Sequence, residues 1–139
     1  MMIKTRGVLV VSFLFLSATV VAEEPDWTNY QAVLNHVKLG EKNSVALMQV
    51  DYQRIKTNGR LDKAYQQLSD FKIDRLSNSN EKLAFYVNAY NILALKKVVD
   101  HWPTKSIKDS GNFFSTVWDK PAGTLNGETV SLGQIEHKI

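Results

Sequence analysis

Two asparagines and a tyrosine lie in the most apolar stretch of the mature chain. Residues 83–95 read LAFYVNAYNILAL and include Asn88, Tyr90 and Asn91. On a helix, Asn88 and Asn91 are three positions apart and share a face. Amides cannot act as general acids or bases, so the pair either orients a ligand or hydrogen-bonds the backbone of a neighbouring loop, such as residues 106–111. All three are candidate ligand-binding residues.

A second polar pair, Glu136 and His137, lies near the C-terminus. Both are candidate catalytic residues, because an imidazole can serve as a general base. The sequence has no cysteine to act as a thiol nucleophile, and it lacks the G-x-S-x-G pattern of a serine nucleophile. The alternative interpretation is that Glu136 and His137 are a polar pair near a helix terminus and have no catalytic role. The spacing of the three histidines is not that of metal ligands, and we expect no metal and no cofactor.

The first 22 residues have the pattern of a secretory signal peptide. Lys4 and Arg6 precede the apolar run of residues 8–16, and residues 20–22 read VVA, which favours cleavage after Ala22. The whole apolar stretch is shorter than the ~20 residues that a membrane-spanning helix needs. We therefore expect an exported protein that is periplasmic in a Gram-negative bacterium and secreted otherwise, with no membrane association after cleavage.

The charge balance of the expected mature chain excludes strongly electrostatic partners. Removing Lys4 and Arg6 from the 17 basic residues leaves 15 against 14 acidic residues, a net charge of +1. Nucleic-acid-binding domains carry a basic stripe, and none is present here. We expect no nucleic-acid partner, and residues 23–139 are long enough for one domain.

Helical periodicity is strongest around the candidate amides. Apolar residues cover every direction of a helix at about 79–101, which indicates a buried central helix. Amphipathic patterns predict two further helices near 26–39 and 60–71 that pack on it, the first stopped by Gly40. Residues 45–50 fit either a short strand or the start of a helix.

The C-terminal part predicts a hairpin followed by a short helix. Asn126-Gly127 is a strong two-residue turn signal within a hairpin at about 113–130. Ser131 and Gln134 have the spacing of a capping box, which opens a helix that stops after about two turns. The predicted fold is α+β and mainly helical, with this last helix truncated.

The order of these motifs resembles the DUF547 family, whose domain is named for its unknown function. The similar segments are residues 81–95 (EKLAFYVNAYNILAL), 101–109 (HWPTKSIKD), 117–118 (VW) and 125–137 (LNGETVSLGQIEH). Family members typically show LAFWINAYN, a P-x-x-S-I-x-D loop, a hairpin and an SL-x-x-IEH helix, and usually continue into a segment with cysteines. The resemblance implies that residues 23–139 form a DUF547-like domain that is incomplete at its C-terminus.

Two functions follow from the resemblance and from the missing cysteines. In the first, the exported domain is non-catalytic as it stands and has a binding or structural role, or is a truncated copy. In the second, it is the N-terminal part of a hydrolase- or transferase-like enzyme whose thiol residues lie downstream of Ile139. An incomplete domain would also leave an apolar C-terminal face uncovered, through which it would self-associate or bind a protein partner.

Overall fold

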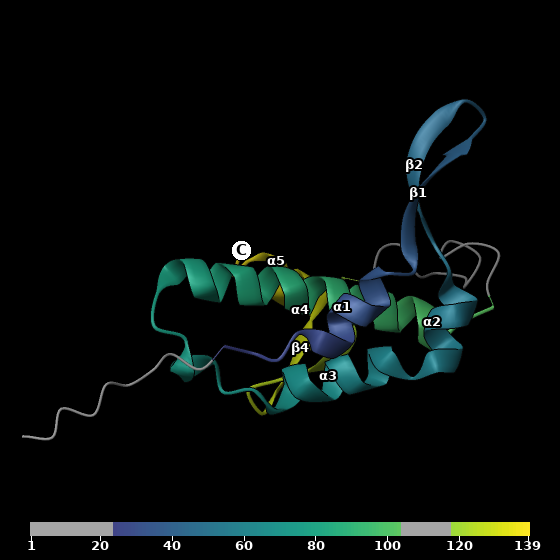
Figure 1. Cartoon of the computed structure of the whole chain (residues 1–139). Helices are drawn as coiled ribbons and strands as arrows, with labels where there is room; N and C mark the ends of the chain where they lie inside the picture. The colour runs from purple at the N-terminus through teal and green to yellow at the C-terminus, as the bar shows by residue number, and fades with distance from the viewer. Residues whose placement is uncertain (1–23, 104–117) are drawn as a thin grey trace, which may run out of the picture.

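In the part of the chain that the structure describes, five α-helices combine with two antiparallel hairpins (Figure 1). The computed structural model describes residues 24–103 and 118–139. In chain order the elements are α1 (Thr28–Leu34), β1 (Val37–Lys42), β2 (Val45–Val50), α2 (Tyr52–Asn58), α3 (Arg60–Asp70), the 3₁₀ turn η1 (Ile73–Arg75), α4 (Ser79–Asp100), β3 (Pro121–Leu125), β4 (Glu128–Ser131) and α5 (Leu132–Glu136). The mainly helical α+β class predicted from the sequence is confirmed.

The long central helix α4 begins and ends close to the predicted positions. Its N-cap is Asn78, whose side chain accepts a hydrogen bond from the Glu81 amide at 3.0 Å. The Glu81 carboxylate in turn accepts from the Ser77 amide at 2.7 Å. These bonds satisfy amide groups that a helix start leaves without an intrahelical partner, and they fix where α4 begins.

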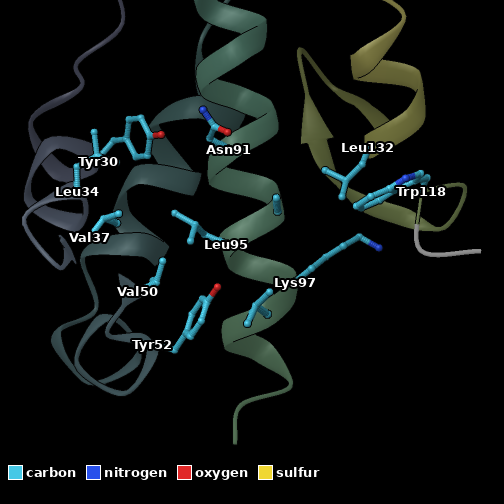
Figure 2. Close-up of a pocket in the computed structure, with 12 residues that line it drawn as sticks. Tyr30, Leu34, Val37, Val50, Tyr52, Asn91, Leu95, Lys97, Trp118 and Leu132 are labelled. Carbon is cyan, nitrogen blue, oxygen red and sulfur yellow. The ribbon is translucent and has the colours of Figure 1, made fainter. Parts of the chain in front are cut away.

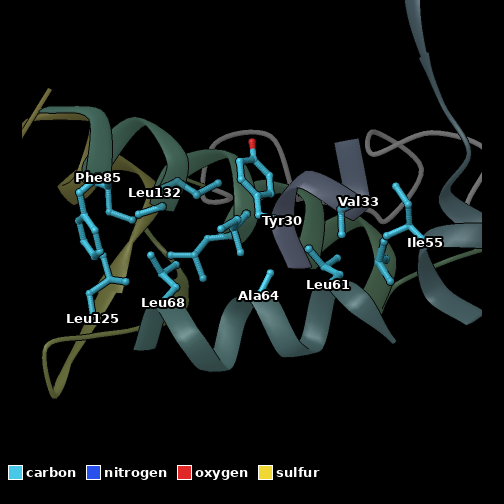
Figure 3. Close-up of a cluster of buried hydrophobic side chains, with 14 of the residues drawn as sticks. Tyr30, Val33, Ile55, Leu61, Ala64, Leu68, Phe85, Leu125 and Leu132 are labelled. Carbon is cyan, nitrogen blue, oxygen red and sulfur yellow. The ribbon is translucent and has the colours of Figure 1, made fainter. Parts of the chain in front are cut away.

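The core lies where α3 and α4 meet the C-terminal hairpin and α5 (Figure 3). From α4, the face that carries Phe85, Ala89, Ile92 and Leu93 is fully buried. The members contributed by the other elements include Val33, Ile55, Leu61, Ala64, Leu68, Leu125, Leu132 and Ile135. The predicted helix at 60–71 is confirmed as α3, which packs against both α1 and α4.

The prediction that α4 is buried on all sides is wrong. Leu83 is 42% exposed and Val87 39% exposed, and Asn91 is exposed on the next turn. Positions 83, 87 and 91 are four apart and therefore form one stripe. The elements that the structure describes pack on the other faces of α4 and leave this stripe open to solvent.

The predicted helix at 26–39 is too long. It ends at Leu34, and Gly40 lies within a strand instead of stopping a helix. Asn43 and Ser44 both adopt positive φ angles, 54° and 62°, which is the geometry of a type I′ turn. This turn pairs Val37 with Val50 in an antiparallel hairpin that stands away from the helices (Figure 1). The segment at 45–50, left open between strand and helix, is therefore strand β2.

The C-terminal hairpin and helix are present as predicted, but the hairpin begins later than expected, because residues 118–120 form a turn and β3 starts at Pro121. Strands β3 and β4 are joined at Asn126-Gly127, with φ angles of 51° and 84°. Ser131 and Gln134 form the complete capping box at the start of α5. The first part of the predicted hairpin, residues 113–117, lies outside the described residues.

Candidate ligand-binding site

The main candidate site is a groove of about 390 Å³ whose floor is the C-terminal half of α4. One wall comes from α1, the base of the first hairpin and the start of α2, and the other from Trp118 and α5 (Figure 2). We call it the α4 groove, and its lining residues are Tyr30, Leu34, Val37, Val50, Tyr52, Asn91, Ala94, Leu95, Lys97, Val98, Trp118 and Leu132.

Apolar and aromatic side chains make up most of the lining. The floor residues Ala94, Leu95 and Val98 are half-buried, so each keeps some surface open to the groove. Trp118 is 49% exposed at the opposite wall. Ligand sites are commonly concave and mostly apolar, with a few polar groups that fix orientation, and the α4 groove has this composition.

At one end of the groove, Asn91 and Tyr30 form a polar pair. The Tyr30 hydroxyl points toward the Asn91 amide (Figure 2), and their side chains are hydrogen-bonded. Burial raises the pKa of Tyr30, and the hydrogen bond with Asn91 opposes that rise in part. A phenol with a raised pKa stays protonated at neutral pH, so the pair presents neutral hydrogen-bonding groups.

Lys97 provides the positive charge of the groove. Its side chain extends from α4 toward the side of Trp118 (Figure 2), and its ammonium group donates to the Lys120 carbonyl at 3.5 Å. Burial, followed by the nearby charge of Lys120, lowers the pKa of Lys97. Lys97 therefore contributes a positive charge to the groove, away from the neutral pair (Figure 2).

Of the three predicted ligand-binding residues, Asn91 alone lines the groove. Asn88 and Tyr90 are half-buried, and Tyr90 packs against the hydrophobic core. The loop at 106–111, considered as a partner for the two amides, lies outside the described residues. The helical spacing therefore places Asn88 and Asn91 on neighbouring turns without bringing both into the groove.

His137 lines a different pocket, also of about 390 Å³, on the C-terminal hairpin. Tyr86, Glu128 and Thr129 contribute polar groups to it. Glu136 is exposed and is not among the lining residues. The predicted catalytic residue and the predicted ligand-binding amide thus line separate cavities.

Sequence reasoning missed most of the groove. Tyr30, Tyr52 and Lys97 all line the groove, and none of them was among the candidate residues. The groove collects side chains from α1, both strands of the first hairpin, α2, α4 and α5. A local sequence pattern cannot predict this groove, because its lining residues come from elements that are far apart in the chain. The signal available was the break in the apolar surface of α4 at Asn91.

Residues 24–103 and 118–139 contain neither a candidate metal site nor a candidate membrane-spanning helix. In these two segments there is no group of three or more His, Cys, Asp or Glu side chains arranged to hold a metal ion. Within the same segments, no helix has the length and apolar character needed to cross a bilayer.

The C-terminal part of the chain matches the model of a known protein family. The model of DUF547, a protein family of unknown function, matches residues 73–139. The matched region begins at η1 and includes α4, β3, β4 and α5. No curated protein and no solved structure matches the chain. The likeness to the DUF547 family thus covers 67 of the 139 residues, just under half of the chain.

Proposed function

We propose that this protein is an exported, non-catalytic binding domain that holds an apolar ligand in the α4 groove. The groove itself is the observation that carries the proposal. It combines a largely apolar lining with a neutral polar pair at one end and a cation at the other. Its volume of about 390 Å³ falls in the range of small-molecule sites.

The polar groups of the groove are better suited to orienting a ligand than to transferring protons. The Asn91 amide donates and accepts hydrogen bonds but does not titrate. The raised pKa of Tyr30 keeps its hydroxyl protonated near neutral pH. Both groups can therefore fix one end of a ligand, while the apolar floor supplies affinity by removing apolar surface from water.

Binding is tested with N-phenyl-1-naphthylamine, an uncharged apolar fluorophore whose emission rises in apolar surroundings. We expect a saturable rise with the wild-type protein. Ala94→Trp fills the floor of the groove and should abolish the rise, whereas Val45→Trp adds the same side chain on the exposed first hairpin and should not. Circular dichroism checks that both variants fold, and Val98→Asp serves as a second groove variant. A non-saturable signal, or equal binding by the two Trp variants, contradicts the proposal.

Export is supported by the signal-peptide pattern of residues 1–22. Expression of the full chain in a Gram-negative host should yield a periplasmic protein whose mass and N-terminus correspond to a start at Glu23. Full-length protein retained in the cytoplasm would count against export. Ligand binding in the groove is tested separately, because the lining residues that the structure describes all fall between Tyr30 and Leu132.

A second candidate function is a hydrolase- or transferase-like activity, of which this chain is the N-terminal part. It is favoured by the position of His137 on a pocket together with Glu128 and Tyr86. An imidazole in a pocket can act as a general base. Turnover of ester or amide substrates that is lost in His137→Ala and kept in His36→Ala would support this alternative over a purely binding role.

A further inference from the structure

The first hairpin exposes apolar side chains away from the core. Leu39 and Met48 are direct partners in the β1–β2 register, so their side chains lie on the same face. They are 74% and 59% exposed, and the hairpin stands away from the helices (Figure 1). An isolated two-stranded hairpin is only marginally stable in water, whereas three or more strands with an apolar face form a stable sheet. The first hairpin would therefore be stabilised by the addition of further strands.

The two edges of this hairpin differ in charge. Strand β1 reads VKLGEK and carries two lysines and a glutamate, and charged side chains, above all lysine, commonly protect a sheet edge from pairing. Strand β2 reads VALMQV and has no charged residue. Among the residues that the structure describes, β2 pairs with no strand other than β1. The edge that is open to another strand is therefore that of β2.

The register shows which backbone groups β2 presents at its open edge. The Asp51 amide donates a hydrogen bond to the His36 carbonyl at 3.0 Å, so the backbone groups of Asp51 point toward the first strand of the hairpin. This direction alternates from residue to residue along an antiparallel ladder. The N–H and C=O groups of Met48 and Ala46 therefore point away from β1 and are placed to pair with a further strand.

We infer that β2 pairs with β2 of a second copy of this chain, in an antiparallel four-stranded sheet in which the two Met48 residues lie opposite each other. Around this two-fold axis, the Met48 N–H of each copy donates to the Met48 C=O of the other. The side chains of Leu39 and Met48 from both copies then form one apolar row across the sheet. No like charges meet at the axis, because β2 is uncharged, and so the edge is complementary to itself.

The antiparallel register also sets where the two domains lie. It places Val45, next to the turn, beside Asp51 of the second copy, at the base of the other hairpin. The helices of the two copies therefore lie at opposite ends of the shared sheet. An interface limited to two six-residue strands is smaller than that of standard stable complexes, so the dimer should be weak and concentration-dependent. This pairing goes beyond ligand binding in the α4 groove and does not depend on it.

Sedimentation velocity of the purified protein between about 5 and about 500 µM tests the association. We expect the weight-average mass to rise from that of one chain toward that of two chains. It should rise no further, because the charged β1 edges remain at the outside of the sheet. A mass of one chain at every concentration, or growth beyond two chains, overturns the inference.

Charge variants at Met48 test the position of the two-fold axis. Like charges directly opposite each other destabilise strand pairing, so Met48→Lys and Met48→Glu should each weaken dimerisation by about tenfold. An equimolar mixture of the two variants should associate to within about threefold of the wild type, because opposite charges then meet. Leu39→Lys adds the same charge on β1 and should change the dissociation constant by less than about threefold. Equal weakening by the two lysine variants, or no recovery in the mixture, overturns the inference.

The absence of cysteine from the chain allows a direct test of the register. In a hydrogen-bonded antiparallel pair the Cα atoms lie about 5.5 Å apart, which a disulfide can span. Met48→Cys should therefore form a covalent dimer with copper–phenanthroline, as two thiols lose two protons and two electrons to this oxidant. In Leu39→Cys the two thiols lie three strand spacings apart, about 14 Å, and should cross-link at least about tenfold more slowly. Equal cross-linking rates of the two variants overturn the inference.

Discussion

The hydroxyl of Tyr65 on α3 accepts a hydrogen bond from the backbone amide of Thr124 on β3, at 3.1 Å. The two residues are 59 positions apart in the sequence. The Tyr65 ring also lies against Gly123, and the Lys96 ammonium lies 5.7 Å from its centre. This side chain therefore joins the C-terminal hairpin of the DUF547 region to a helix that precedes it.

Gly123 should not tolerate a side chain. A Cβ atom at this position would lie 2.5 Å from Leu93 Cδ2 and 2.8 Å from Tyr65 Cε2. Because both neighbours are packed, Gly123→Ala should lower the free energy of unfolding by about 1–3 kcal/mol, as measured by urea denaturation. Gly133→Ala is the comparison. A Cβ atom at Gly133 would lie 3.2 Å from the carbonyl oxygen of Trp118, so this variant should lose less free energy of unfolding than Gly123→Ala. Equal stability of Gly123→Ala and wild type would contradict the close packing of β3 on α3 and α4.

Removing only the Tyr65 hydroxyl tests the bond to Thr124. Tyr65→Phe keeps the ring that touches Gly123 but leaves the half-buried Thr124 amide without this acceptor. We expect a loss of about 1 kcal/mol in the free energy of unfolding. Faster hydrogen exchange at the Thr124 amide should accompany it. An unchanged exchange rate at Thr124 would show that the bond does not protect the hairpin.

The structure distinguishes two roles for Asn91. If its amide were buried and supported a loop, Asn91→Leu would cost a few kcal/mol. Because Asn91 is exposed and lines an open groove, we expect a loss of no more than about 1 kcal/mol in thermal unfolding. A double-mutant cycle with Tyr30→Phe should give a coupling energy of about 0.5–1.5 kcal/mol. Zero coupling would mean that the two side chains act independently.

Acid stability should depend on Glu81. Hydrogen bonds from the Ser77 amide, at 2.7 Å, and the Ser77 hydroxyl, at 3.0 Å, hold the pKa of this carboxyl below its ordinary value. The folded state therefore favours the ionised form, and this stabilisation is present above the unfolded-state pKa and is lost as the pH falls through the folded-state pKa. The free energy of unfolding of Glu81→Gln should fall less steeply on acidification than that of the wild type. Glu41→Gln, on the exposed first hairpin, should follow the wild-type profile.

The parts of the fold that the sequence predicted are those with local signals. The N-cap at Asn78, the turn at Asn126-Gly127 and the capping box at Ser131 each depend on residues within four positions of one another. Local hydrogen bonds fix these features, so their positions follow from residue types alone.

The errors arose where distant residues decide the structure. Val37 fits the apolar stripe of a helix, but pairing with Val50 across the Asn43–Ser44 turn places it in a strand. The apolar surface of α4 indicated burial on every side, although the described elements leave the stripe through Val87 open. The α4 groove depends on both features, because the base of the first hairpin forms one wall and α4 forms the floor. The α4 groove could therefore be identified only from the tertiary structure.

The two hairpins should contribute very differently to stability. Strands β1 and β2 contact chiefly each other, and Leu39 and Met48 are 74% and 59% exposed. Replacing residues 38–49 by a two-residue Asn-Gly turn between Val37 and Val50 should therefore lower the free energy of unfolding of the remaining domain by less than about 1 kcal/mol, because little apolar surface is removed from its core.

Truncation of a single side chain in the second hairpin provides the contrast. Leu125 is 4% exposed and belongs to the core, so Leu125→Ala should cost about 2–5 kcal/mol in urea denaturation. The β1–β2 replacement should thus be the milder change although it removes far more residues. If it destabilises the domain as much as Leu125→Ala does, the first hairpin supports the core and does not simply project from it.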